Sequence, residues 1–96
     1  MPQLRYVTAA IRDLERLREF LRPKNPAVAR QAAQTILKAL QVLRLQPGMS
    51  RPIDGLPDEF REWVIDFGSS GYVARDRIDE DAITVLALRH QKEAGF

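Results

Sequence analysis

Apolar residues recur with helical spacing in the first half of the chain. Between residues 8 and 22 they return every three or four positions, which predicts a helix of about four turns with one apolar stripe. Thr8 is predicted to cap this helix through its hydroxyl group. Pro23 disfavours helical geometry at Arg22, so the helix should end there. The predicted stripe consists of Ile11, Leu14, Leu17 and Leu21.

A second helix is predicted directly after this break. Asn25 is a favourable N-cap, and Pro26 suits the first helical position because its missing N–H would have no partner there. The sequence "QPG" at 46–48 should end the helix. The two helices would then form an antiparallel hairpin with a tight connection. The predicted buried stripe consists of Ala29, Ala32, Ala33, Ile36, Leu40 and Leu43.

The second half of the chain changes to a period of two. Residues 61–67, 72–78 and 82–88 are rich in β-branched and aromatic residues and are predicted strands, as is the short segment 4–7. Turns are expected at "GSSG" (68–71) and "DED" (79–81), and a loop at 49–60. The order β-α-α-β-β-β predicts a single α+β domain over residues 1–96, with the helix hairpin packed on a largely antiparallel sheet.

Composition narrows the possible chemistry. The 96 residues are 45% apolar and 29% charged, as in a soluble globular domain, and no apolar run approaches membrane-spanning length. The chain contains no cysteine and one histidine, so neither a disulfide nor a metal site is predicted. It also has no phosphate-binding glycine loop or nucleophile elbow, and no cofactor is expected. Without an apolar signal-peptide core, the expected compartment is the cytoplasm.

Charge is distributed unevenly. Residues 1–51 contain ten basic and three acidic residues, a net +7, whereas residues 52–96 contain five and ten, a net −5. The N-terminal half is therefore suited to an anionic partner. A solvated helical face together with acidic turns explains the same numbers equally well.

Arginines on the predicted strands form a candidate binding surface. Alternation places Arg75 and Arg77 on one sheet face, opposite Tyr72, Ala74, Asp76 and Ile78. They could bind phosphates or a partner's carboxylates, or simply form cross-strand ion pairs on a solvated face. Arg61 and Arg89 would extend the patch if they share this face.

His90 lies beside Arg89 just after the last predicted strand. A histidine there can serve as an acid–base catalyst if a partner positions it. A lone histidine near a terminus is more often non-catalytic, and we favour that interpretation.

The stretch "GLPDEFREWVIDFGSSGYVARDRIDEDAITVLALRHQKEAGF", the segment "KNPAVARQ" and the element order resemble the RelE/ParE superfamily of type II toxin–antitoxin toxins, and the ParE-like branch most closely. The resemblance covers nearly the whole chain. It implies a growth-inhibiting toxin that is neutralised in a hetero-oligomer by a cognate antitoxin encoded beside it. ParE-like toxins are associated with inhibition of DNA gyrase and plasmid stabilization, whereas RelE-like relatives cleave mRNA on the ribosome.

The resemblance also bears on catalysis. An arginine that RelE-like ribonucleases carry on this strand falls at Val73, and their C-terminal histidine or tyrosine falls at or beside Gln91. Because this set is incomplete, we predict a non-catalytic gyrase inhibitor with no catalytic residue. A ribosome-dependent endoribonuclease and an attenuated member that only binds its antitoxin are the alternatives. The candidate residues for binding the target or the antitoxin are Arg61, Trp63, Arg75, Arg77, Arg89 and His90.

Asp76 departs from the family pattern, in which a tyrosine or another large residue usually occupies this position. A carboxylate at a mid-strand site otherwise suited to an aromatic residue is costly unless it is paired. Two interpretations are open: neighbouring arginines compensate the charge, or the substitution attenuates the toxin.

Overall fold

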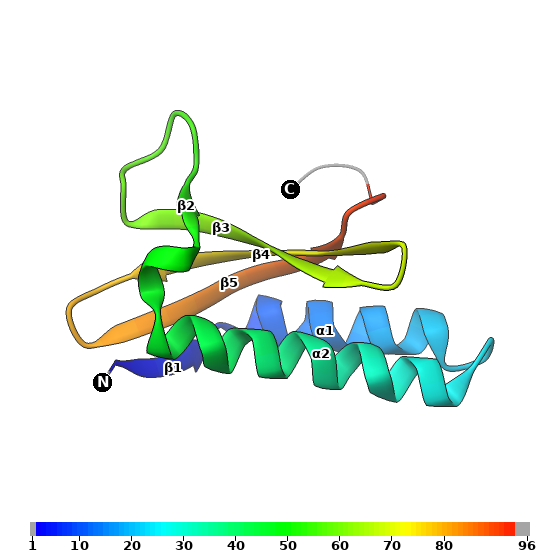
Figure 1. Cartoon of the computed structure of the whole chain (residues 1–96). Coiled ribbons are helices and arrows are strands. Elements are labelled where there is room, and N and C mark those ends of the chain that lie inside the picture. The colour runs from blue at the N-terminus through cyan, green and yellow to red at the C-terminus, as the bar shows by residue number, and fades with distance from the viewer. Residues whose placement is uncertain (1, 94–96) are drawn as a thin grey trace.

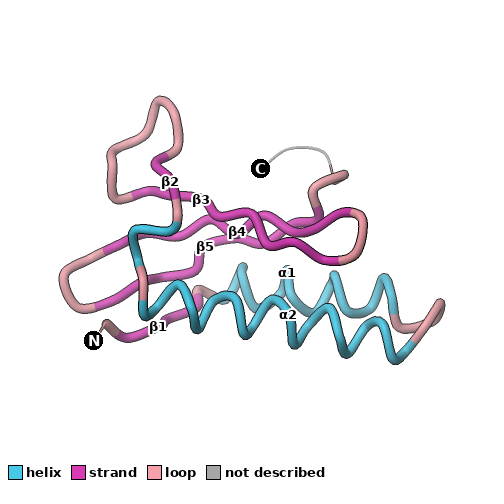
Figure 2. The backbone as a smooth tube through the Cα atoms, in the orientation of Figure 1, coloured by secondary structure: helices cyan, strands magenta, loops and turns pink. Residues whose placement is uncertain are grey.

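A layer of two antiparallel helices lies against one face of a five-stranded sheet in the computed structural model, which describes residues 2–93 (Figures 1 and 2). A short 3-10 helix, Pro47–Met49, follows the second helix. The elements in chain order are β1 (Gln3–Tyr6), α1 (Thr8–Leu21), α2 (Pro26–Leu45), β2 (Arg51–Pro52), β3 (Phe60–Phe67), β4 (Ser70–Ile78) and β5 (Ala82–His90).

The sheet has the strand order β1-β5-β4-β3-β2. β1 runs parallel to β5, and the other neighbouring strands are antiparallel. This arrangement confirms the predicted α+β fold. The quoted stretch that carries the resemblance ends in residues 94–96, which lie outside the described residues.

Local sequence explains where each helix begins. The Asn25 side chain accepts a hydrogen bond from the Val28 N–H at 3.2 Å, as predicted for the cap of α2. The predicted Thr8 cap is wrong, because Val7 is the N-cap of α1 and its side chain forms no capping bond. The Val7 N–H donates to the Val85 carbonyl at 3.1 Å, so β1 pairing continues up to the helix and Thr8 is already helical.

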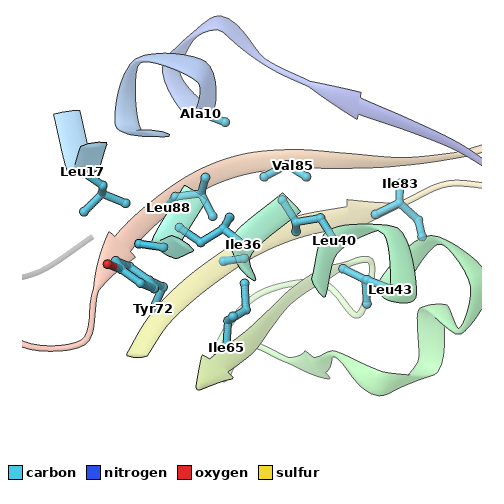
Figure 3. Packing of buried hydrophobic residues seen from close by; sticks show 12 residues of the cluster. Ala10, Leu17, Ile36, Leu40, Leu43, Ile65, Tyr72, Ile83, Val85 and Leu88 are labelled. Carbon is cyan, nitrogen blue, oxygen red and sulfur yellow. The ribbon is translucent and has the colours of Figure 1, made fainter. Parts of the chain in front are cut away.

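The core lies between the helices and the sheet. The whole predicted stripe of α2 is buried, and Leu40 is fully so. Figure 3 shows its larger members, Ile36, Leu40 and Leu43, in the core. On α1 the buried residues are Ala10 and Leu17. Ile11 was predicted in this stripe, but its side chain is 51% exposed. The helix places successive residues about 100° apart, so a face centred on Ala10 and Leu17 turns Ile11 toward solvent.

Two features of the sheet were not predicted. The presumed loop 49–60 contains β2, which pairs with residues 61 and 62 of β3. β5 contains a bulge: Arg75 lies opposite Ala87, whereas Asp76 lies opposite Val85, which leaves Leu86 without an opposite residue. The bulge lets both Val85 and Leu88 face the core, which strict alternation would not allow. None of the helices in residues 2–93 is long and apolar enough to span a bilayer.

Candidate functional site

Three of the four candidate arginines share the sheet face that points away from the helices. Arg75 and Arg77 alternate with core-facing residues of β4, as predicted. Arg89 pairs directly across from Val73, which lies on the same outer face, and cross-strand neighbours share a face. We call Arg75, Arg77 and Arg89 the outer-face arginines.

The outer-face arginines form ion pairs with carboxylates and hydrogen bonds with backbone carbonyl groups. Glu62 of β3 lies 3.1 Å from Arg51 and 3.6 Å from Arg75, measured between nitrogen and oxygen atoms. Arg77 lies 3.4 Å from Asp79. The two Glu62 contacts match the cross-strand ion pairs that the sequence allowed, whereas Asp79 lies in the turn after the strand that carries Arg77. Arg89 donates to the carbonyl of Glu93 at 3.0 Å, so it fastens the segment that follows β5.

Arg61 does not extend the outer-face arginines. It pairs across from Asp76 and therefore lies on the helix side of the sheet. Its Nε–H donates to the Ser50 carbonyl at 2.9 Å, and its Nη2 contacts the same oxygen. The β3–β4 register places Arg61 opposite Asp76 and Arg75 opposite Glu62. Arg61 and Arg75 therefore lie on opposite faces of the sheet. The prediction that Arg61 could join the patch is therefore wrong.

Ser50, Arg61 and Asp76 form what we call the sealed cluster. Asp76 and Ser50 are almost wholly buried, and Ser50 Oγ lies 3.5 Å from Asp76 Oδ2. Within residues 2–93, Asp76 Oδ1 has no hydrogen-bond partner. Burial raises the pKa of Asp76 to about 6, although the charge of Arg61 and the hydrogen bond of Ser50 oppose the rise. The compensating arginine is thus the cross-strand Arg61, not the adjacent Arg75 or Arg77.

A groove opens at the other end of the helix-facing layer, beside the β3–β4 turn. Its volume is about 630 Å³, and most of its lining is apolar. Phe20 lines it while 65% exposed, which is unusual for so large an apolar side chain. Lys24 lies over the Phe20 ring, with Nζ 3.7 Å from the ring centroid. The groove is lined by Arg16, Leu17, Phe20, Leu21, Phe67, Tyr72, His90, Lys92 and Glu93.

His90 lines this groove and is held by three neighbouring residues. Its ring packs edge-on against Tyr72, with centroids 5.4 Å apart and planes at 85°. Its Nδ1 accepts a hydrogen bond from the backbone N–H of Lys92 at 3.1 Å, and the backbone N–H of His90 donates to Glu93 Oε1 at 2.7 Å. The second oxygen of Glu93 contacts Arg16 of α1. These bonds fix the imidazole as part of the groove wall.

Tyr72 also lines the groove. Burial and the negative charge of Glu93 raise the pKa of its hydroxyl group. Its neighbour Phe67 lies 6.1 Å away, measured between ring centroids.

Trp63, the remaining candidate, is half-buried on β3 and packs against the core away from the outer-face arginines. Across residues 2–93, no three histidine or acidic side chains come together as a metal-binding group.

Sequence reasoning missed the groove itself. Its walls come from α1, the β3–β4 turn and the segment after β5, which only the fold brings together. One signal was available: Phe20 falls outside the helical stripe, and an exposed phenylalanine beside Lys24 is typical of a binding surface.

Comparisons with known proteins agree with this architecture. Residues 4–95 match the family model described as the ParE toxin of the type II toxin–antitoxin system, parDE. Toxin RelE3 of Caulobacter vibrioides is 32% identical over 84 residues, which is 88% of each chain.

Two solved structures share the fold. One, from the chromosomal ParDE toxin–antitoxin system of P. aeruginosa, superposes with a TM-score of 0.73 at 18% identity, over 94% of this chain and 96% of that one. The other, from the RelBE2 toxin–antitoxin complex of Mycobacterium tuberculosis, has a TM-score of 0.59 at 20% identity, over 95% and 100% of the two chains. The family-model match and the Caulobacter relative together establish that this chain belongs to the ParE toxin family, within the RelE/ParE superfamily of type II toxin–antitoxin toxins.

Proposed function

We propose that this toxin arrests growth in the cytoplasm by binding DNA gyrase, without catalysing a reaction itself, and that a cognate antitoxin neutralises it. The observation that carries the proposal is the state of His90. Its Nδ1 is occupied by the Lys92 N–H, and its ring is packed on Tyr72. Because Nδ1 accepts this bond, the neutral ring carries its proton on Nε2, so neither nitrogen offers a free lone pair to a substrate proton. A general base needs such a lone pair, so a histidine bound in this way is suited to shaping a surface.

The antitoxin part of the proposal rests on the relatives. The P. aeruginosa protein comes from a ParDE system, and the M. tuberculosis protein was solved as a toxin–antitoxin complex. An apolar groove with basic side chains at its rim is suited to a partner segment that combines apolar and acidic residues. The expected partner is the small protein encoded beside the toxin gene.

A second candidate function is ribosome-dependent mRNA cleavage. It is favoured by the name of the Caulobacter relative, Toxin RelE3, and by the three outer-face arginines, which are suited to phosphate groups. A family member that only binds its antitoxin is the third candidate, and Asp76 is the observation behind it.

Purified toxin and gyrase distinguish the first two candidates. We expect the toxin to inhibit supercoiling of a relaxed plasmid and, when induced in cells, to cause filamentation with a DNA-damage response. His90→Gln keeps hydrogen-bonding capacity but removes the titratable group, so inhibition should be largely retained.

Primer extension on a translated message supplies the opposing readout. If wild type cuts mRNA while a folded, antitoxin-binding His90→Gln variant does not, with a loss of roughly 10²–10⁴-fold in rate, the gyrase proposal is wrong and His90 is catalytic. Continued growth after induction at matched protein level would favour the third candidate.

A further inference from the structure

The side of α2 that faces away from the sheet has an unusual composition. α2 contains three basic residues, Arg30, Lys38 and Arg44, and no aspartate or glutamate. Successive helical residues are about 100° apart, so five exposed polar residues between positions 30 and 41 share one arc of about 100°, opposite the buried stripe. The exposed apolar residues Leu37 and Val42 flank this arc. We call its five members the exposed α2 face: Arg30, Gln31, Gln34, Lys38 and Gln41.

The fold does not use the charges of this face. On α1, two arginines form ion pairs with glutamates three residues earlier in the chain. Within residues 2–93, by contrast, Arg30 and Lys38 take part in no ion pair and no side-chain hydrogen bond. Both cations therefore meet only solvent and can exchange it for an anionic ligand at little cost to the folded protein.

The order of side chains around the helix suits a groove with charged walls. Arg30 and Lys38 are about 80° apart around the helix, and Gln34 and Gln41 fall between them. A helix that presents this face to a groove would therefore direct one cation toward each wall and amides toward the floor. The 20 residues of α2 extend over about 30 Å, which exceeds the width of any nucleic-acid groove.

The combination of cations and amides indicates duplex DNA as the partner. The major groove of B-DNA is about 12 Å wide and admits an α-helix between two rows of phosphates. Lysine and arginine bind the phosphates, and a glutamine amide can donate to and accept from one adenine edge at the same time. An acidic protein surface would attract the cations but offers no comparable match for three amides.

α1 limits the extent of such a contact. Its glutamates Glu15 and Glu19 are exposed on the neighbouring helix and would repel phosphates. Duplex RNA is a poorer partner than DNA, because its major groove is deep and narrow and does not admit side chains. The contact should therefore be confined to α2 and to the B-form duplex.

We infer that the toxin itself binds double-stranded DNA through the exposed α2 face, with Arg30 and Lys38 on phosphates and the three glutamines toward base edges in the major groove. This inference goes beyond the proposed function, because it concerns the toxin's own contact with nucleic acid and requires neither gyrase nor an antitoxin.

Titration of a short labelled DNA duplex with purified toxin tests the phosphate contacts. Arg30→Gln combined with Lys38→Gln removes both cations and keeps residues that favour a helix. At about 50 mM salt, we expect affinity to fall roughly 10- to 100-fold, and the dependence of log affinity on log salt should become shallower by about two. The control, Arg5→Gln combined with Arg51→Gln, removes the same charge from exposed positions of the sheet and should change affinity far less.

The glutamines are tested by Gln34→Ala combined with Gln41→Ala. This change leaves the charge intact, so the salt dependence should match wild type. Wild type should bind a duplex that contains A·T pairs roughly 5-fold more tightly than one made only of G·C pairs, and the variant should lose this preference. A variant that keeps the preference would show that these amides do not contact bases.

Duplex RNA of the same length provides a test on the wild-type toxin alone. It carries the same number of phosphates, yet it should bind at least roughly 10-fold more weakly than DNA. Equal affinity for the two duplexes, equal losses in the two double-arginine and arginine–lysine variants, or no binding of DNA by wild type at low salt would each overturn the inference. Because the titration contains neither gyrase nor antitoxin, none of these results would decide the function proposed above.

Discussion

The two ends of the helix-facing layer solve the burial of polar groups in opposite ways. At one end, Tyr72 and His90 border an open groove, where the Nδ1 and the backbone N–H of His90 form hydrogen bonds to the tail residues Lys92 and Glu93. At the other end, Asp76 is enclosed with Ser50 and Arg61. Tyr72 and Asp76 lie four residues apart on the same face of β4. One strand therefore joins a surface open to a partner with a closed, electrostatically costly interior.

This difference indicates which end of the layer can bind a partner. The groove exposes apolar area that a partner can cover, which favours association. The sealed cluster has no room for a partner, and its imperfect hydrogen bonding lowers the stability of the toxin itself. We therefore expect substitutions near Asp76 to change folding and substitutions in the groove to change binding.

Leu40→Ala should have the largest effect on stability. Leu40 is fully buried under the sheet, so truncation should lower the free energy of unfolding by about 2–5 kcal/mol. Leu37→Ala is the matched control on the same helix, since Leu37 is 40% exposed and should lose far less. Chemical denaturation measures both. Equal losses would contradict the assignment of the core.

Asp76 should make stability depend on pH. Its folded pKa is raised to about 6 from an ordinary value of 3.8, so its contribution to stability is fully present below about pH 4 and is lost as the pH rises through 6. Asp76→Asn should remove this loss and be more stable than wild type at pH 8, by roughly 2–3 kcal/mol. At pH 4 the two proteins should differ little.

Unfolding curves of wild type and Asp76→Asn across pH 4–8 provide the measurement, and Asp66→Asn is the control because Asp66 is exposed. A stability difference that does not change with pH would show that the Asp76 carboxylate is better compensated in the folded protein than Arg61 and Ser50 alone allow.

His90→Gln should have a smaller effect, confined to the groove. It removes the edge contact with Tyr72, which should lower the free energy of unfolding by about 0.5–1.5 kcal/mol. The control is Gln91→Ala, an exposed neighbour after the same strand. If His90→Gln lowered the free energy of unfolding as much as Leu40→Ala, His90 would belong to the core, and the proposed difference between the two ends would be wrong.

Glu93→Gln should have the smallest effect. Glu93 pairs with the partly exposed Arg16, and such surface pairs contribute less than about 1 kcal/mol. The small loss should shrink further in high salt, because the pair is screened. Glu19→Gln, which breaks the Arg22–Glu19 pair of α1, is a comparable surface control. A large loss insensitive to salt would mean that the tail is integral to the core.

The α2 stripe was predicted completely because its members recur at helical spacing along one face, although α2 also carries the exposed apolar residues Leu37 and Val42. It failed at Ile11, because α1 offers two overlapping apolar stripes, and packing against β5 selects the one through Ala10. For Asp76 it predicted the cost of burial but not the compensating residue. Cross-strand register, which brings Arg61 opposite Asp76, is a property of the folded sheet.

The bulge in β5 was beyond sequence reasoning for a similar reason. Simple alternation from Ile83 and Val85 would have turned Arg89 toward the helices and His90 toward the outer face. The bulge reverses both orientations, because Arg75 pairs with Ala87 and Asp76 with Val85, which leaves Leu86 of β5 unpaired between them. The groove and the outer-face arginines both depend on this single irregularity, which no local pattern in "AITVLALRH" announces.

The position of β5 has a consequence for how the toxin is made. Among the described strands, the one latest in the chain, β5, lies between β1 and β4, and Gln3 pairs with Ala82. The helix hairpin depends on nearby residues and can form early, whereas pairing between such distant segments closes slowly. On the ribosome, therefore, β1 cannot pair with its neighbour until residues 82–90 have emerged. A message interrupted before these residues are translated leaves the sheet without the strand that joins β1 to β4.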